Sequence, residues 1–219
     1  MKAKHEICTM QILIIAATEP EIQPFINADT GIDVLITGVG VPSTMYHLQK
    51  RIQQIDYDFI IQAGIAGSLN AAIELGKTVF VQQDCFADLG IEEEENYTPI
   101  FKTIFADSNE FPFTDGWLIN ADKHVSNTSL STVKSITVNK VSDAELQKQQ
   151  YIKLFNADIE TMEGAALHYI CLQENIPFLQ IRSVSNFVGE RDKTKWKMKE
   201  AIENLNIELL KLINEPACR

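Results

Sequence analysis

The chain has 219 residues, of which 45% are hydrophobic, and it carries a formal net charge of −11 at pH 7. Such a length and composition are typical of one globular domain with a single large core. The negative charge argues against a nucleic-acid backbone or an anionic membrane as partner, because either would repel the protein at long range. A small-molecule ligand is therefore favoured.

Signals for membrane insertion, secretion and metal binding are weak. No apolar run approaches the roughly 20 residues that cross a bilayer, and residues 1–10 lack the long apolar centre of a secretory signal. We therefore expect a cytoplasmic protein, with residues 10–214 as one domain and residues 1–9 as an extension of unknown role. The histidines are scattered, and so are the cysteines, which makes a disulfide framework or a zinc site improbable: Cys8, Cys85, Cys171 and Cys218.

Short β-branched runs alternate with helical patterns along the chain. The predicted strands are at 12–17, 34–37, 59–63, 78–82, 135–138 and 178–183. Helices are predicted from Thr18, over Met45 to Ile55, from about 165 and over 198–213. This alternation predicts an α/β fold with a mostly parallel sheet. The acidic run from Glu92 to Glu95 is expected in a solvated loop.

Two glycine-rich segments each follow a predicted strand. The first, Thr37 to Ser43, has only two of the three glycines of a dinucleotide fingerprint, so a tight strand-to-helix turn is the better interpretation. The second, Ala63 to Ser68, has small side chains that would let a flat ligand approach the backbone. Because neither segment contains the lysine of a phosphate-binding loop, ATP chemistry is not indicated.

Several motifs together resemble one known family. They are Ala16 to Glu21 after the first strand, the turn Gly64 to Gly67, the segment Glu160 to Ala166 and the segment Ser183 to Asp192. In order and spacing they resemble the nucleoside phosphorylase/nucleosidase superfamily, and within it they are most similar to the futalosine hydrolase branch. The resemblance implies a three-layer α/β/α fold with a central mixed, mostly parallel sheet. It also implies hydrolysis of the N-ribosidic bond of a purine nucleoside without metal or organic cofactor.

The resemblance gives roles to two carboxylates. Glu163 would bind the ribose 2′- and 3′-hydroxyls, with Met162 against the ribose face, since a carboxylate accepts two hydrogen bonds and favours an electron-poor sugar. Glu21 would activate the attacking water as general base. Each has a structural alternative: Glu163 as an acidic residue in the first turn of a helix, and Glu21 as the partner of Thr18 in a capping box.

Asn186 bears on which base is released. In adenine-releasing relatives an Asp occupies the corresponding place and protonates N7, whereas an amide has no titratable proton. Asn186 can hydrogen-bond a 6-oxopurine edge, which favours hypoxanthine as leaving group, as in futalosine; the alternative is a turn residue after the strand. The rival activities are a methylthioadenosine/S-adenosylhomocysteine nucleosidase and a purine nucleoside phosphorylase. Phosphorolysis is disfavoured because neither 16–24 nor 64–69 contains Arg or Lys.

Further positions are expected to bind substrate or complete the pocket. Arg191 and Trp196 could recognise a carboxylated aromatic 5′ group, or could be a surface ion pair with Asp192 and a packing aromatic. The aromatic-rich run 101–117 is expected to be a subunit contact or lid in a homo-oligomer, because family members commonly complete their pockets across a dimer. The remaining candidates line the base or ribose: Ile65, Ala66, Gly67, Asn139 and Val141, with Asp88 beside them.

Overall fold

The computed structural model describes residues 10–94, 96–121, 130–141 and 143–214. The expected extension at 1–9 lies outside these residues, as do Cys8 and Cys218. Cys85 and Cys171 are buried free thiols.

Helices and strands alternate through most of the chain. The strands are β1 (Ile12–Ala16), β2 (Asp33–Ile36), β3 (Phe59–Ser68), β4 (Thr78–Asp84), β5 (Gly90–Glu93), β6 (Asn96–Pro99), β7 (Leu118–Ile119), β8 (Ser131–Thr137), β9 (Ile159–Thr161) and β10 (Phe178–Phe187). The α-helices are α1 (Glu19–Asn27), α2 (Val41–Ile52), α3 (Glu145–Phe155), α4 (Gly164–Gln173) and α5 (Met198–Leu212), with short 3-10 turns η1 (Ile100–Lys102) and η3 (Lys193–Lys195).

The main sheet is mixed, with more parallel than antiparallel pairings. Parallel pairs join β1 to β2 and β3, β3 to β10, and β8 to β4 and β9. Antiparallel pairs join β10 to β4, β3 to β9 and β4 to β7. Because β3 pairs with both β9 and β10, the strands β3, β10, β4, β8 and β9 curl into a closed circuit, while β1 and β2 extend from it.

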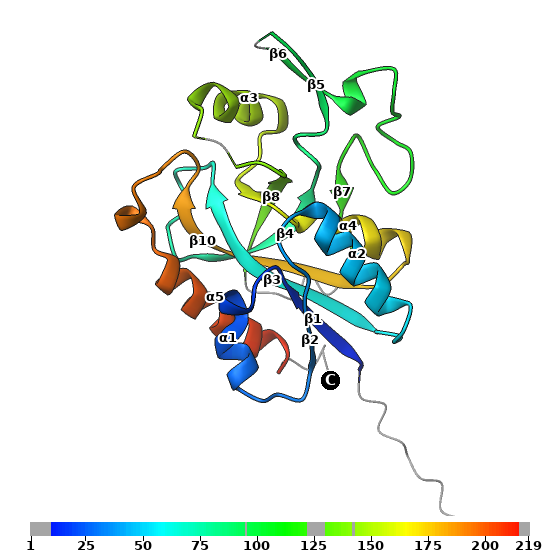
Figure 1. Cartoon of the computed structure of the whole chain (residues 1–219), viewed down its shortest axis with the longest axis vertical. Coiled ribbons are helices and arrows are strands. Elements are labelled where there is room, and N and C mark those ends of the chain that lie inside the picture. Colours follow the sequence, from blue (N-terminus) through cyan, green and yellow to red (C-terminus); the bar gives the residue numbers. More distant parts are fainter. Residues whose placement is uncertain (1–9, 95, 122–129, 142, 215–219) are drawn as a thin grey trace, which may run out of the picture.

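Helices cover both faces of the open part of the sheet, which gives the expected three layers (Figure 1). The strand β1 shows why its sequence is continuously apolar. Ile12 and Ile14 pack into a core cluster with helices α1 and α5, whereas Leu13 and Ile15 pack into a second cluster with α2 and α4. A strand buried on both faces needs an apolar side chain at every position.

The last helix follows its predicted apolar stripe. Leu205, Leu209 and Leu212 are buried in the same cluster as β1, and Ile207, between the stripe positions, is 50% exposed. Burial of one face of an amphipathic helix against the sheet is the main source of its stability in a domain of this kind.

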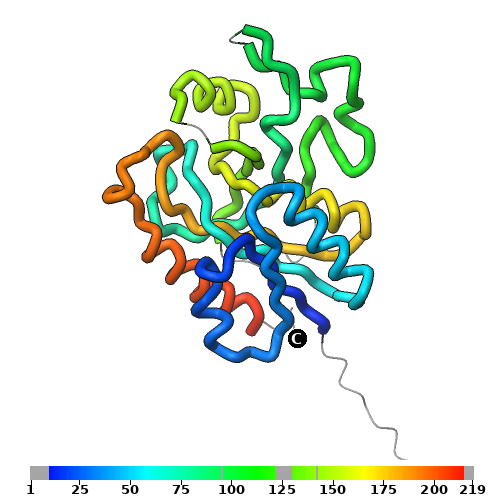
Figure 2. Tube along the Cα trace, viewed as in Figure 1, coloured from blue at the N-terminus to red at the C-terminus, as the bar shows by residue number. Residues whose placement is uncertain are grey.

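Several elements differ from the sequence-based expectation. The solvated loop predicted at 92–95 is wrong for Glu92 and Glu93, which are strand residues of the β5–β6 hairpin, while exposure to solvent is confirmed for both and for Glu94 in the turn. The elements β7, β9 and α3 were not expected, and strands β3 and β10 are longer at their carboxyl ends than predicted. Figure 2 shows that the β5 to β7 segment and α3 lie at the end of the molecule away from α1 and α5. Of the described helices, none has the length and apolar character needed to cross a membrane.

Candidate active site

A cavity of about 470 Å³ lies at the carboxyl ends of the parallel strands β1, β3 and β10, together with the segment after β9. This is the edge of an open α/β sheet where ligands generally bind. The structure brings nearly all the predicted site residues to its walls: Glu21, Ile65, Ala66, Gly67, Val141, Met162, Glu163, Asn186 and Arg191.

Glu21 is held at the start of α1 by two kinds of contact. Its Oε2 accepts hydrogen bonds from the backbone N–H of Thr18 at 3.0 Å and from the Thr18 hydroxyl at 2.8 Å. Its Oε1 accepts the N–H of Ile65 in β3 at 3.0 Å. The predicted capping contact with Thr18 therefore exists, and the same carboxylate also reaches across to β3 at the cavity wall.

Glu163 is fixed by a helix start and by a buried cation. Its Oε1 accepts the N–H of Gly40, the N-cap residue of α2, at 3.0 Å. Gly40 has φ +89°, a conformation that favours glycine, and this turn aims its N–H at the carboxylate. Its Oε2 lies 3.9 Å from Nη1 of Arg182. Burial raises the pKa of Glu163, while Arg182 and the Gly40 N–H oppose the rise and the charge of Glu21 adds to it.

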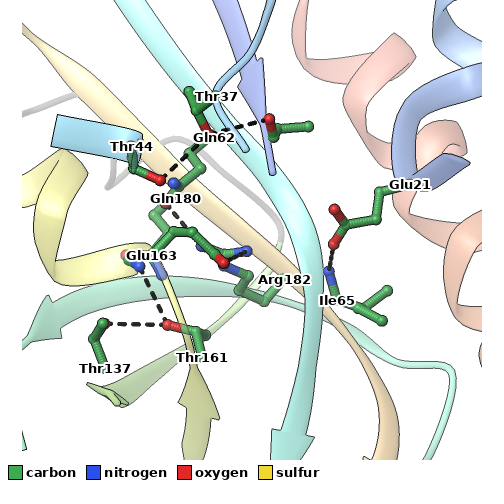
Figure 3. A network of polar contacts seen from close by, with 12 residues as sticks. Glu21, Thr37, Thr44, Gln62, Ile65, Thr137, Thr161, Glu163, Gln180 and Arg182 are labelled. Carbon is green, nitrogen blue, oxygen red and sulfur yellow. Dashed lines mark hydrogen bonds and ion pairs between the residues drawn. The ribbon is translucent and has the colours of Figure 1, made fainter. Parts of the chain in front are cut away.

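Arg182 is a site residue that the sequence analysis missed. It is 1% exposed, and its Nη2 donates to Oε1 of Gln62 at 2.8 Å. A Cβ on Gly64 would clash with its Nη1 and would lie 3.1 Å from Oε1 of Glu21, so the guanidinium fills the space under the glycine turn. Figure 3 shows Arg182 beside Glu163, and Glu21 beside Ile65. One signal could have found it: a charged residue within a strand that otherwise reads as buried.

A buried polar network supports the start of α4, which directly follows Glu163. The hydroxyl of Thr137 donates to Oδ1 of Asp84 at 2.9 Å and accepts the N–H of Ala165 at 2.8 Å. Burial raises the pKa of Asp84 to about 6, against the hydrogen bonds that favour its ionised form. These contacts anchor the first turn of α4 to β4 and β8, and so hold the backbone that carries Glu163.

Asn186 reaches the cavity through an irregularity of β10. The pairing of β10 with β3 shifts between Val184 and Asn186, so Ser185 is an extra residue and Asn186 lies opposite Gly67. Such bulges redirect side chains next to binding sites. The amide Nδ2 donates to the carbonyl of Phe187 at 3.0 Å, and Oδ1 accepts the Ser185 hydroxyl at 2.8 Å. One N–H and one lone pair of the amide remain for a ligand.

Asn139 departs from the expectation that it lines this cavity. Its backbone N–H and its Nδ2 both donate to the carboxylate of Asp88. Together the two residues line a neighbouring cavity of about 560 Å³ with Phe86, Phe101 and Tyr169. The two hydrogen bonds to Asp88 hold Asn139 on that side of the segment, whereas Val141, two residues later, lines the first cavity.

Arg191 and Trp196 line the outer part of the first cavity. Arg191 is largely exposed and its Nε lies 3.2 Å from Oδ2 of Asp143, so its ion pair is with Asp143 and not with Asp192 as the surface alternative supposed. Trp196 donates its indole N–H to the carbonyl of Glu190 at 3.0 Å. Both side chains can therefore meet a ligand that extends out of the cavity.

The charge of the cavity decides what it can bind. Among the described residues that line it, one is cationic, Arg191, and four carry carboxyl groups: Glu21, Glu160, Glu163 and Glu190. This arrangement suits a neutral hydroxyl-rich ligand that becomes positively charged during reaction, and it repels an anionic co-substrate. Arg182 adds a cation near the glycine turn, but it is buried and bonded to Glu163 and Gln62. Within the described residues no three His, Cys, Asp or Glu side chains gather as a metal site.

Comparison with known proteins gives a consistent match. The family model described as the phosphorylase superfamily matches residues 29–214. A futalosine hydrolase from Thermus thermophilus is 27% identical over 191 residues, covering 85% of this chain and 83% of its own. A 5′-methylthioadenosine/S-adenosylhomocysteine nucleosidase from Buchnera aphidicola is 24% identical over 198 residues, covering 82% of this chain and 77% of its own.

The fold also matches solved structures. The native structure of futalosine hydrolase from Helicobacter pylori superposes with a TM-score of 0.78 at 15% sequence identity, covering 94% of this chain and 98% of that chain. The shared architecture is the mixed sheet with helices on both faces described above.

Proposed function

The chain belongs to the phosphorylase superfamily, and from this membership and the cavity we propose that it is an N-ribosidic hydrolase that cleaves futalosine to hypoxanthine and dehypoxanthine futalosine. The observation that carries the proposal is the presence of Glu21, Glu163 and Asn186 on the walls of one cavity. Similarity to a futalosine hydrolase over most of both chains supports the choice of substrate.

The transition state of the reaction places positive charge on the ribose and negative charge on the departing base. In this proposal Glu163 accepts hydrogen bonds from the ribose 2′- and 3′-hydroxyls. The guanidinium of Arg182, beside Oε2, favours the ionised form of this carboxylate. Met162 lies against the sugar face. The buried carboxylate stabilises the developing cation more strongly than it would in water, because the cavity excludes much of the solvent.

Glu21 takes a proton from the attacking water. Its Oε2 accepts two bonds from Thr18 and its Oε1 accepts one from Ile65. These bonds fix the carboxylate for proton transfer and leave a lone pair on Oε1 for a water molecule. Hydrolysis is favoured over phosphorolysis because the acidic lining of the cavity opposes a phosphate co-substrate.

Asn186 selects the base. The spare N–H of its amide suits the O6 acceptor of hypoxanthine, where adenine presents a donor. The rival activity, release of adenine from methylthioadenosine or S-adenosylhomocysteine, is supported by similarity to a nucleosidase of that kind.

The remaining assignments complete the proposal. Residues 10–214 form the catalytic domain, and Ile65, Ala66, Gly67, Val141 and Arg191 contact substrate; Asn139 lies with Asp88 in the neighbouring cavity and has no assigned contact with the substrate. The enzyme works in the cytoplasm as a homo-oligomer, in the futalosine route to menaquinone, and uses neither a metal nor an organic cofactor.

The test is identification of the released base. Purified protein is incubated with 5′-modified inosine-type and adenosine-type nucleosides, with and without inorganic phosphate, and the products are separated by chromatography. We expect hypoxanthine at a rate that does not depend on phosphate. Adenine release without hypoxanthine would establish the rival nucleosidase, and a phosphate-dependent rate would refute hydrolysis.

A further inference from the structure

Glu160 in β9 is a carboxyl group on the cavity wall to which no role has yet been given. Glu160 is 7% exposed. The other three carboxyl groups of the cavity have partners: Glu21 with Thr18 and Ile65, Glu163 with Gly40 and Arg182, and Glu190 with Lys195 at 2.7 Å. Among the described residues the carboxyl of Glu160 makes no hydrogen bond or ion pair. Its carboxyl oxygens are not among the buried polar atoms that lack a partner, so they open onto the cavity, where a ligand can reach them.

The sheet places Glu160 and Asn186 on either side of a glycine. Gly67 of β3 is paired with Glu160 across the antiparallel ladder with β9 and with Asn186 across the parallel ladder with β10. Residues opposite one another in a ladder present their side chains on the same face. A Cβ at Gly67 would lie 2.9 Å from Cγ2 of Val188 and 3.6 Å from Nδ2 of Asn186. Val188 therefore packs over Gly67, and its side chain forms the apolar surface between Asn186 and Glu160, which lie about two strand spacings, roughly 10 Å, apart.

A planar base resting on Val188 above Gly67 would therefore meet Asn186 at one edge and Glu160 at the other. The two groups differ in whether they can transfer a proton to the leaving base. The amide of Asn186 can donate a hydrogen bond but cannot give up a proton at neutral pH, whereas a carboxyl group can.

The surroundings of Glu160 favour the protonated form. Burial, and then the charge of Asp88, raise its pKa to about 7. The other titratable groups that interact with it or share its cavity are Tyr151 on α3, the carboxyl groups of Glu21, Glu163 and Glu190, and the guanidinium of Arg191. The one cation in this set, Arg191, is paired with Asp143 at 3.2 Å and is not among the causes that set the pKa of Glu160.

We propose that Glu160 is the acid that protonates the departing base, in place of the aspartic acid that Asn186 replaces. The inference rests on the proposed function. The bond between C1′ and the base nitrogen breaks with its electron pair moving to the base, and the Glu160 proton moves to a ring nitrogen of that base. The water oxygen bonds to C1′ and its proton moves to Glu21. Neutral base and free sugar leave, and proton exchange with solvent returns Glu160 to its acid form and Glu21 to its base form.

The test compares two leaving groups in the variant Glu160→Gln, with the exposed Glu93→Gln as the matched control. The substrates are an inosine-type nucleoside and its N7-methylated form, whose base already carries positive charge and departs without being protonated. The variant should lose about 10²-fold or more in kcat on the first substrate and much less on the second, while Glu93→Gln changes neither rate.

Equal losses on both substrates, or no loss on the first, would overturn the assignment. A second variant, Glu160→Asp, keeps a transferable proton and should retain more activity than Glu160→Gln on the unmethylated nucleoside; less activity would also count against the proposal. If the unaltered protein cleaves neither substrate, the proposed function itself fails, which is a distinct result from selective loss in the variant.

Discussion

The burial of Glu160 should make the stability of the protein depend on pH, and the substitution Glu160→Gln should remove this dependence. The residue is 7% exposed, and burial followed by the charge of Asp88 raises its pKa from 4.5 to about 7. At ~1.4 kcal/mol for each pH unit between the two values, ionising this carboxyl in the folded protein costs on the order of 3 kcal/mol.

The direction of the effect follows from the two pKa values. Below the value of 4.5 the carboxyl is neutral in the folded and unfolded chain alike, so the folded state keeps its full stability. Between 4.5 and about 7 the unfolded chain gives up its proton first, and stability falls until the folded carboxyl also ionises. Glutamine resembles the protonated carboxyl in shape but never ionises, so the stability of Glu160→Gln should not show this decrease with pH.

The assay is urea unfolding of the unaltered protein, Glu160→Gln and the exposed control Glu93→Gln across this pH range. The difference in unfolding free energy between Glu160→Gln and the unaltered protein should grow by on the order of 3 kcal/mol from the acidic to the alkaline end. The control should give a difference that is flat with pH. A flat difference for Glu160→Gln would show that its carboxyl is not held in the protonated form, and the reasoning from burial would be refuted.

Four other substitutions test different contacts. Glu21→Gln should lower kcat by about 10²-fold or more while nucleoside binding, measured by calorimetry, persists; the exposed Glu19→Gln in the same helical turn should leave the rate unchanged. Asn186→Asp should shift the ratio of adenine to hypoxanthine release toward adenine by about 10-fold or more, because the ionised carboxylate repels O6 whereas the protonated carboxyl can give its proton to N7; an unchanged ratio in a competition assay would remove Asn186 from base selection. Gly64→Ala should cost ~1–3 kcal/mol and lower kcat, because the new methyl group displaces Arg182 from Glu163; full activity at normal stability would contradict this. Leu205→Ala should cost ~2–5 kcal/mol in urea unfolding, whereas Ile207→Ala on the exposed side of α5 should cost less than ~0.5 kcal/mol.

The fold was predictable wherever burial imposes a simple pattern. The continuous apolar run of β1 and the stripe of α5 each reflect one environment along the whole element, so periodicity identifies them. The helix α3 gives no such signal, because Tyr151 is its one buried residue among those described. The strand β9 has three residues and is defined by pairing with β3 and β8, which a local pattern cannot reveal.

The candidate site was predictable in its turns and not in its interior. Glu21 and Glu163 lie at the starts of α1 and α4, just after strands, and Asn186 lies near the end of β10; at these places polar residues interrupt apolar runs and family motifs can be read. Arg182 lies inside β10, and only the fold brings it beneath Gly64 from 118 residues away in the chain. Asn139 and Val141 are two residues apart and line different cavities, because Asp88 holds the first of them.

The central claim is that one nucleoside lies with its sugar at Glu163 and its base at Asn186. The most direct measurement is a crystal structure of the Glu21→Gln variant with an intact 6-oxopurine nucleoside. The account predicts the ribose hydroxyls on Glu163, the purine edge between Asn186 and Glu160, and one water between residue 21 and C1′. A nucleoside bound in the neighbouring cavity beside Asn139, or one whose sugar does not contact Glu163, would contradict it.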